Sequence, residues 1–235
     1  MKLVILAGGF GTRISEETIN KPKPLVNIGS KPIIWHLMKI YSHFGINDFI
    51  VCQGYKGPML KKELSKYIAK ENWNIKFVET GLHTMTGGRI KKIEKYIKDD
   101  DHFCVSYGDG LCNVNINKLI NFHIKNKKIA TLTAVRPPVR FGELIINDNK
   151  VEEFAEKPQS GKGWINGGFF VFNKEIFNYI EDDSIMLERE PLEKLSKMGE
   201  LMAYKHDDFW QCMDTIREKE ILEALLNSNS APWLK

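Results

Sequence analysis

The sequence contains 235 residues, a length that fits one large domain with a substantial core and excludes a miniprotein held together by disulfides. Apolar residues make up 43% and charged residues 27%, close to globular averages, so an intrinsically disordered chain is excluded as well. The 34 Lys and Arg residues barely outnumber the 30 Asp and Glu residues, for a net charge of +4, which argues against a dedicated nucleic-acid-binding arm. A cleft can nevertheless gather a few cations around a small anionic ligand.

The cysteines form no CxxC pair and have no histidines at zinc-ligand spacing, so we expect free thiols in a reducing compartment. They are Cys52, Cys104, Cys112 and Cys212. The N-terminal apolar run covers only Leu3 to Ala7 before glycines and Arg13 follow, which indicates a buried strand rather than a signal peptide. No stretch reaches the ~18–20 apolar residues of a membrane span. We therefore predict a cytoplasmic protein with no membrane or nucleic-acid partner.

Short apolar runs alternate with helical patterns in the first half of the chain. Strands are expected at 3–6, 48–53, 75–78 and 102–107, and helices at about 32–44, 59–68 and 87–97. Strands separated by helices favour βαβ crossovers, and hence a mostly parallel sheet covered on both faces. In such sheets ligands bind beyond the carboxyl ends of the strands, so the turns after Ala7 and Tyr107 are expected to carry the chemistry.

The pattern changes after about Ile129. Strands are expected at 130–135, 144–146, 151–154 and 168–172 with little helix between them, which indicates a mixed or antiparallel extension. Helical patterns return at 174–180, 190–197 and 216–226. Because the sequence has no internal repeat, low-complexity segment or Gly/Ser linker, we expect a single α/β domain over 1–235.

The most informative stretch is Leu6-Ala-Gly-Gly-Phe-Gly-Thr-Arg13, which is followed by Lys21-Pro-Lys-Pro24. Its three glycines allow the backbone to approach a ligand closely and to aim successive N–H groups at phosphate oxygens. The loop is neither a Walker A motif nor the GxGxxG dinucleotide motif. A tight turn alone would also explain the glycines, but the presence of Arg13 and Lys23 in the same loop favours phosphate binding.

The stretch Tyr107-Gly-Asp-Gly110 places Asp109 directly after an expected buried strand. A carboxylate there can hold Mg²⁺, which takes one or two carboxylates together with substrate phosphates. The alternative is a turn role, since Asp-Gly is common in turns. A metal role needs a second carboxylate, and Asp214 in Trp210-Gln-Cys-Met-Asp-Thr215 is the candidate. The alternative for that residue is an ordinary helix N-cap.

Three further stretches are individually weak signals. Glu156 and Lys157 end an expected strand, where they could hold sugar hydroxyls and a phosphate or form a solvated turn. Asn166-Gly-Gly168 offers an amide for hydroxyl groups, although turn geometry alone would explain it. Thr84-Met-Thr-Gly-Gly-Arg89 opens an expected helix, so its second threonine is a candidate cap. Arg89 beside the positive end of that helix dipole is unfavourable unless an anion is present, which favours a functional role.

Together these stretches resemble the sugar-phosphate nucleotidyltransferase family, and they span nearly the whole chain in order. The stretches that carry the resemblance are LAGGFGTRISEETINKPKPLV, KPIIWHLMKIYSHFGINDFIVCQGYKG, TMTGGRIKKI, YGDG, RFGEL, EKP, INGGFFV and FWQCMDT. The Glu16-Glu17 pair, Trp35-His36, the 84–89 stretch and the Ala-Pro-Trp ending are similar to the cytidylyltransferase branch rather than the thymidylyl or uridylyl branches. The resemblance implies a Rossmann-like three-layer α/β/α fold, with a mostly parallel mixed sheet and a small antiparallel extension.

The same resemblance implies a Mg²⁺-dependent condensation of CTP with glucose 1-phosphate that releases pyrophosphate, in a homo-oligomer. It implies that the nucleotide is held by Leu6, Ala7, Gly8, Gly9, Phe10, Gly11, Thr12, Arg13, Lys23, Thr84, Arg89 and Gly108. It implies that the sugar phosphate is held by Glu156, Lys157, Asn166 and Gly167. Asp109 and Asp214 would ligate Mg²⁺, and Arg13, Lys23 and Asp109 would be catalytic. The nucleotide part would cover about 1–128 and the sugar-phosphate part about 129–235.

The sequence departs from the family pattern in one region. Only the residues Pro58–His83 lie between Gly54-Tyr-Lys-Gly57 and Thr84, where typical members carry a longer insert. The oligomeric assembly and the preferred sugar 1-phosphate or nucleotide, UTP or dTTP included, are therefore left open. A glycosyltransferase of related fold is an alternative, but it has no need of the Arg13 and Lys23 pair. A non-catalytic binding subunit would have no need to keep every candidate residue.

Overall fold

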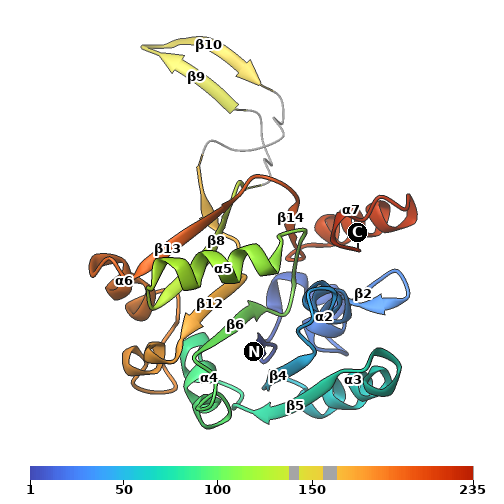
Figure 1. Ribbon diagram of the computed structural model, residues 1–235. Helices are drawn as coiled ribbons and strands as arrows, with labels where there is room; N and C mark the ends of the chain where they lie inside the picture. Colours follow the sequence, from blue (N-terminus) through green and yellow to red (C-terminus); the bar gives the residue numbers. More distant parts are fainter. Residues whose placement is uncertain (138–142, 156–162, 235) are drawn as a thin grey trace.

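The computed structural model describes residues 1–137, 143–155 and 163–234 (Figure 1). The strands of its main sheet are β1 (Leu3–Leu6), β4 (Asp48–Gln53), β5 (Asn74–Glu79), β6 (His102–Tyr107), β8 (Ala130–Val135), β11 (Ile165–Asn166), β12 (Phe170–Asn173) and β13 (Leu201–His206). Their order is β11-β8-β12-β6-β1-β4-β5, with β13 paired to β8. The strands β1, β4, β5 and β6 are mutually parallel, whereas β12 runs antiparallel to both β6 and β8.

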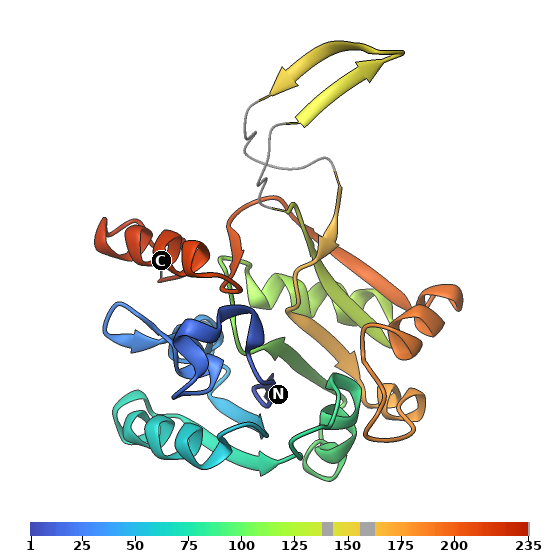
Figure 2. The same cartoon turned by 180° about the vertical axis from the view of Figure 1, so that it is seen from behind.

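Helices cover both sides of this sheet, as the two opposite views show (Figures 1 and 2). The α-helices are α1 (Ser15–Thr18), α2 (Ile33–His43), α3 (Gly57–Glu71), α4 (Thr86–Lys92), α5 (Ile116–Asn126), α6 (Glu190–Lys197) and α7 (Ile216–Asn227). The 3₁₀ helices are η1 (Thr12–Ile14), η2 (Lys23–Leu25), η3 (Glu94–Tyr96), η4 (Lys174–Tyr179) and η5 (Pro232–Leu234). The predicted α/β fold with helices on both faces is thereby confirmed.

Three two-stranded sheets complete the fold. They are β2 (Asn27–Ile28) with β3 (Lys31–Pro32), β7 (Gly110–Cys112) with β14 (Trp210–Cys212), and β9 (Glu143–Asn147) with β10 (Lys150–Ala155). The β7–β14 pair matters most for function, because β7 directly follows the Tyr107-Gly-Asp-Gly110 turn. The β9–β10 hairpin is the antiparallel extension expected from the sequence, and it projects from the sheet (Figure 1).

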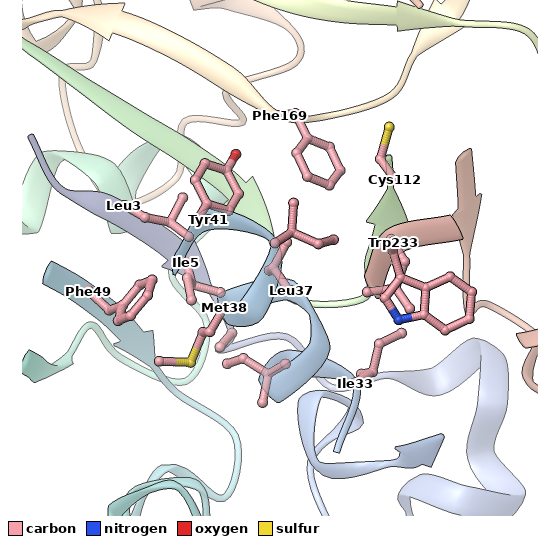
Figure 3. Close-up of a cluster of buried hydrophobic side chains, with 14 of the residues drawn as sticks. Leu3, Ile5, Ile33, Leu37, Met38, Tyr41, Phe49, Cys112, Phe169 and Trp233 are labelled. Atoms are coloured by element: carbon pink, nitrogen blue, oxygen red, sulfur yellow. The ribbon is translucent and has the colours of Figure 1, made fainter. Parts of the chain in front are cut away.

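Alternating residues of the central strands face two separate cores, as expected for a sheet covered on both sides. Leu3 and Ile5 of β1 belong to the cluster beneath α2, whereas Val4 and Leu6 face the cluster beneath α4 and α6. In the first cluster Tyr41 of α2 stacks on Phe169 with ring centroids 5.9 Å apart. Trp233 lies on the side of this cluster opposite Phe49 (Figure 3). These two cores hold the strand ends, and therefore the turns that follow them, in fixed positions.

Most predicted elements form, but two predicted helices differ. The helix expected at 87–97 ends at Lys92 and is followed by the separate turn η3. Ile90, Ile93 and Ile97 are all fully buried. Their spacing therefore indicated which residues are buried, and did not mean that one helix continues over all three. The segment expected to be helical at 174–180 is the 3₁₀ helix η4.

Several elements were not expected from the sequence, among them α5, whose sequence is rich in Asn and Lys, and β13, which is only partly buried. The short elements α1, β2, β3 and β7 were not expected either. Beyond Ile129 the sheet is mixed, as predicted, with β13 parallel to β8.

Candidate active site

The turns after β1 and β6 lie side by side because the two strands are parallel neighbours, with Leu6 opposite Tyr107. The Gly108 amide donates to the Leu6 carbonyl at 3.2 Å and joins the two turns directly. A Cβ added at Gly108 would lie 3.2 Å from Cγ of Pro24, so the segment that carries Lys23 packs closely on the second turn. The two turns that were expected to carry the chemistry are therefore adjacent, at the carboxyl edge of the sheet.

Antiparallel pairing of β7 with β14 brings the two candidate metal ligands together. Cys212 pairs with Gly110, and the Met213 amide donates to the Asp109 carbonyl at 2.9 Å. Asp109 immediately precedes β7, and Asp214 follows β14 after one intervening residue. Since the two strands run in opposite directions, these positions lie at the same end of the pair although they are far apart in the sequence.

Lys23 lies between the two carboxylates. Its Nζ is 2.5 Å from Oδ2 of Asp109 and 2.6 Å from Oδ1 of Asp214, and its side chain is 9% exposed. Arg13 Nη1 contacts the other Asp214 oxygen at 2.5 Å, and its side chain is 75% exposed. Four residues singled out from the sequence thus form one cluster of two cations and two anions, with Arg13 on its solvent side.

The charges of this cluster shift the pKa values of Lys23 and Asp214. Burial alone would raise the pKa of Asp214, but the hydrogen bond and charge of Lys23, together with the charge of Arg13, lower it. Burial alone would lower the pKa of Lys23, but Asp109 and Asp214 raise it. At neutral pH Lys23 is therefore a cation and Asp214 an anion. The cluster can offer positive charge to phosphate oxygens and negative charge to a cation.

The interpretation of Asp214 as only a helix cap is wrong, because Thr215 caps α7. The Thr215 hydroxyl accepts from the Glu218 amide at 3.3 Å, and the Glu218 carboxylate accepts from the amides of Thr215 and Asp214 at 2.9 and 2.7 Å. This capping box provides hydrogen-bond partners for free backbone N–H groups at the start of α7. The Asp214 side chain is left to pair with Lys23 and Arg13.

Arg89 of α4, which is 4% exposed, fixes the start of the glycine loop. Its Nη2 donates to the Gly8 carbonyl at 3.0 Å. Its Nη1 donates, at 2.6 to 3.1 Å, to three further oxygens, those of Gln53, Thr80 and Gly81. These partners are carbonyl and hydroxyl oxygens, and they solvate the buried guanidinium. Direct contact between Arg89 and a nucleotide stays a prediction.

The tip of the glycine loop is open. Nothing lies within 4 Å of a Cβ placed at Gly9, and Phe10 is 42% exposed, with its ring centroid 5.4 Å from that of Tyr55. Gly11 has φ +69°, a conformation that favours glycine, and is the N-cap residue of η1, in which Thr12 is exposed. The loop therefore combines a fixed base with an accessible tip, as a ligand-binding backbone requires.

Gly8→Ala is expected to destabilise the protein by roughly 1–3 kcal/mol, because its Cβ would lie 2.1 Å from Nη1 of Arg89 and must displace that buried guanidinium. Gly9→Ala is the matched control, since its Cβ meets no atom within 4 Å, and its stability is expected to stay within about 0.5 kcal/mol of wild type. Urea unfolding of both variants measures the difference. Equal stability of the two would contradict the assigned role of Arg89.

Three of the remaining predicted site residues, Thr84, Asn166 and Gly167, form hydrogen bonds with other parts of the chain. The Thr84 hydroxyl is 3.3 Å from Oδ2 of Asp183, beside the start of α4. Asn166 accepts from the Gly168 amide at 2.9 Å, as in the turn alternative, and its Nδ2 lies 3.4 Å from the Tyr107 hydroxyl. The Gly167 carbonyl accepts from the Trp210 indole at 2.8 Å. Glu156 and Lys157 lie outside the described residues.

The interpretation of Thr86 as a cap is also wrong. Met85 is the N-cap residue of α4, and the Thr86 hydroxyl donates instead to Oε2 of Glu188 at 2.6 Å. The other oxygen of Glu188 accepts from the Tyr107 hydroxyl at 2.6 Å. Sequence reasoning missed Glu188, because Leu187-Glu-Arg-Glu190 reads as a solvated charged stretch and carries no signal of a buried partner.

Two negative findings apply to the described residues, 1–137, 143–155 and 163–234. Within them, no group of three or more His, Cys, Asp or Glu side chains is arranged to hold a metal ion. Within the same ranges, no helix has the length and apolar character needed to cross a membrane.

Known proteins are similar to this chain over nearly its full length. The family model described as nucleotidyl transferase matches residues 2–219. A glucose-1-phosphate cytidylyltransferase of Salmonella typhimurium is 48% identical over 253 aligned positions, which cover 99% of this chain and 98% of the relative. A mannose-1-phosphate guanyltransferase of Aspergillus oryzae is 32% identical, with coverage of 95% of this chain and 63% of the relative.

Solved structures and alignment lengths add to the comparison. The crystal structure of HddC from Yersinia pseudotuberculosis superimposes with a TM-score of 0.77 at 28% identity, and covers 96% of this chain and 99% of that one. The alignment of 253 positions with the Salmonella protein exceeds the 235 residues of this chain, so that relative contains residues without a counterpart here. From its near-complete match to the family model and its full-length relatives, the chain belongs to the nucleotidyl transferase family.

Proposed function

We propose that this protein condenses CTP with α-D-glucose 1-phosphate to form CDP-glucose and pyrophosphate, with Mg²⁺ as cofactor. The observation that carries the proposal is the convergence of Arg13, Lys23, Asp109 and Asp214 beside an open glycine loop at the carboxyl edge of the sheet. The choice of CTP and glucose 1-phosphate is supported by the 48% identity to the Salmonella cytidylyltransferase over nearly the full length of both chains.

The donor set of the cluster fits Mg²⁺. Asp109 and Asp214 both contact the single Nζ atom of Lys23, so their oxygens lie close enough to share one cation. Mg²⁺ in proteins is commonly held by one or two carboxylates, with substrate phosphates and water as the other ligands. When bound, it would neutralise charge on the triphosphate and on the departing pyrophosphate. Asp109 and Asp214 are the residues that would hold it.

The reaction needs alignment and charge compensation rather than a general base. An anionic oxygen of the sugar phosphate attacks the α-phosphorus of CTP, the new O–P bond forms, and the bond to the β-phosphate oxygen breaks. The second pKa of a phosphate monoester is ~6, so this nucleophile is already ionised at neutral pH. Lys23 and Arg13 supply positive charge next to the triphosphate, and the N–H groups of the glycine loop orient it.

Each half of the chain would hold one substrate. Residues of about 1–128 would bind CTP through the glycine loop, Thr84 and Gly108, and residues of about 129–235 would bind the sugar phosphate through Glu156, Lys157, Asn166 and Gly167. We also propose a homo-oligomer located in the cytoplasm. The cysteines at 52, 104, 112 and 212 are free thiols, as a reducing compartment requires.

Product identification tests the proposal. Purified protein is incubated with CTP, glucose 1-phosphate and Mg²⁺, pyrophosphate release is followed, and the nucleotide product is identified by mass spectrometry. We expect CDP-glucose and pyrophosphate in equal amounts, with no release when either substrate is omitted or when EDTA removes Mg²⁺. Absence of pyrophosphate from this mixture and from those with other sugar 1-phosphates or nucleotides would contradict nucleotidyl transfer.

A further inference from the structure

Glu188 connects two parts of the site that lie on different elements. Oε2 accepts from the hydroxyl of Thr86, the first residue of α4, at 2.6 Å. Oε1 accepts from the hydroxyl of Tyr107, the last residue of β6, also at 2.6 Å. The first contact reaches the helix that carries Arg89, on the nucleotide side. The second reaches the turn that carries Asp109.

The chain around Glu188 is held rigidly against α4. The Met85 amide donates to the Asp183 carbonyl at 2.8 Å, and the amides of Gly87 and Gly88 donate to the Ile185 carbonyl at 3.0 and 3.2 Å. A Cβ at Gly87 would lie 2.7 Å from the Ile185 carbonyl oxygen, so the segment 183–188 touches the helix backbone directly. The half-buried carboxylate of Glu188 is therefore placed by backbone contacts rather than by a free side chain.

A third contact extends this chain of hydrogen bonds to the sugar side. Asn166 Nδ2 lies 3.4 Å from the Tyr107 hydroxyl, while its Oδ1 accepts from the Gly168 amide at 2.9 Å. The proton of the Tyr107 hydroxyl is donated to Oε1 of Glu188. Because the hydroxyl proton is donated to Glu188, the Tyr107 oxygen accepts the hydrogen bond from Asn166 Nδ2. The order is thus Thr86, Glu188, Tyr107, Asn166.

We propose that Glu188 is a positioning residue that couples the nucleotide side of the site to the sugar-phosphate side. This inference rests on the proposed function, in which Thr84–Arg89 serves CTP and Asn166 serves the sugar phosphate. The start of α4, on the nucleotide side, is thereby linked through one carboxylate to Tyr107 and from there to Asn166. Removal of the carboxylate uncouples the two substrates without removing a group that touches either of them.

The test uses steady-state kinetics of the full chain with CTP and glucose 1-phosphate varied in turn. Glu188→Ala is expected to raise the KM of both substrates about tenfold. Tyr107→Phe and Thr86→Val each break the same chain of hydrogen bonds, so each is also expected to raise the KM of both substrates. Because all three act through one chain of hydrogen bonds, the effects of Tyr107→Phe and Thr86→Val are expected to vanish in the Glu188→Ala background. Glu181→Ala, an exposed acid of the same region, is the matched control and keeps both KM values.

The outcomes separate this inference from the proposed function. An inactive wild type contradicts the proposed function itself. An active wild type with Glu188→Ala values within twofold of it, or with fully additive double variants, overturns the coupling role alone. If Glu188→Ala does not fold, Glu188→Gln replaces it, and the joint rise of both KM values in Tyr107→Phe and Thr86→Val decides the question. An effect of either variant that is confined to the substrate on its own side overturns the inference.

Discussion

Asp109→Asn is expected to lower turnover of CTP and glucose 1-phosphate by on the order of a thousandfold, with little change in unfolding stability. Asparagine keeps the size of the side chain and a carbonyl acceptor for Lys23, which still pairs with Asp214 at 2.6 Å. It removes one of the two negative charges that would hold Mg²⁺, and charge compensation at the transition state is the main demand of this reaction. The measurement is kcat at saturating substrates, together with urea unfolding.

The control for this variant is Asp101→Asn. Asp101 is exposed and precedes β6, at the opposite end of the strand from Asp109, so the change of charge is the same but remote from the site. Its activity is expected to equal that of wild type. Activity of Asp109→Asn near wild type would remove Asp109 from the metal site and leave only its role in the turn.

Lys23→Met is expected to abolish most activity and also to destabilise the protein. The ammonium group is the shared partner of Asp109 and Asp214, and its loss leaves two partly buried carboxylates facing one another. Loss of a charge that neutralises the triphosphate is expected to cost on the order of 10²–10³ in kcat/KM. Removal of one partner from such an ion pair costs roughly 2–3 kcal/mol of unfolding free energy at pH 7.

The pH dependence of that destabilisation follows from the directions of the pKa shifts. The pKa of Asp214 is lowered in the fold, so its contribution is present above its unfolded value and is lost as pH falls through the folded value. The pKa of Lys23 is raised, so its contribution is present below its unfolded value and is lost only as pH rises through the folded value. The free energy of unfolding of wild type should therefore exceed that of Lys23→Met by the full amount near pH 7, and by less below about pH 4.

Added Mn²⁺ or Mg²⁺ provides an independent readout for this variant. Without the ammonium group between them, Asp109 and Asp214 are expected to bind a divalent cation more tightly, so thermal unfolding of Lys23→Met should rise more on metal addition than that of wild type. Arg13→Met is the comparison, because Arg13 pairs with Asp214 from the solvent side and its side chain is 75% exposed. Equal stability of wild type and Lys23→Met at pH 7 would contradict the described ion pairs.

The location of the site could be predicted from the sequence because parallel strands end at a common edge. The order of strands and helices in the first half indicated that edge, and the pairing of β1 with β6 places Gly8 and Asp109 on neighbouring turns, as expected. The glycine loop and the lysine framed by prolines are contiguous in sequence, so their chemistry was visible without a fold. The same reasoning gave Asp214 only as a candidate, with a helix cap as the alternative.

The remaining features depend on contacts between distant segments. Asp214 joins Asp109 through the two short strands β7 and β14, whose three residues each are too few to show a pattern. Arg89 points at the Gly8 carbonyl because a buried cation needs oxygens around it, which no local rule specifies. Glu188 contacts Thr86 and Tyr107 only in the folded chain, because several helices and strands separate these residues in the sequence. The spacing of apolar residues indicates which residues are buried, and it does not indicate these polar contacts.

Cytidylyl transfer to glucose 1-phosphate is tested by comparing kcat/KM among pairs of nucleotide and sugar phosphate. Pyrophosphate release is measured for CTP, UTP, dTTP and GTP, each with glucose 1-phosphate and mannose 1-phosphate, at fixed Mg²⁺. We expect CTP with glucose 1-phosphate to give the highest kcat/KM of all pairs, and Asp109→Asn to remove this activity. A higher value for UTP, dTTP or GTP, or for mannose 1-phosphate with CTP, would contradict this expectation.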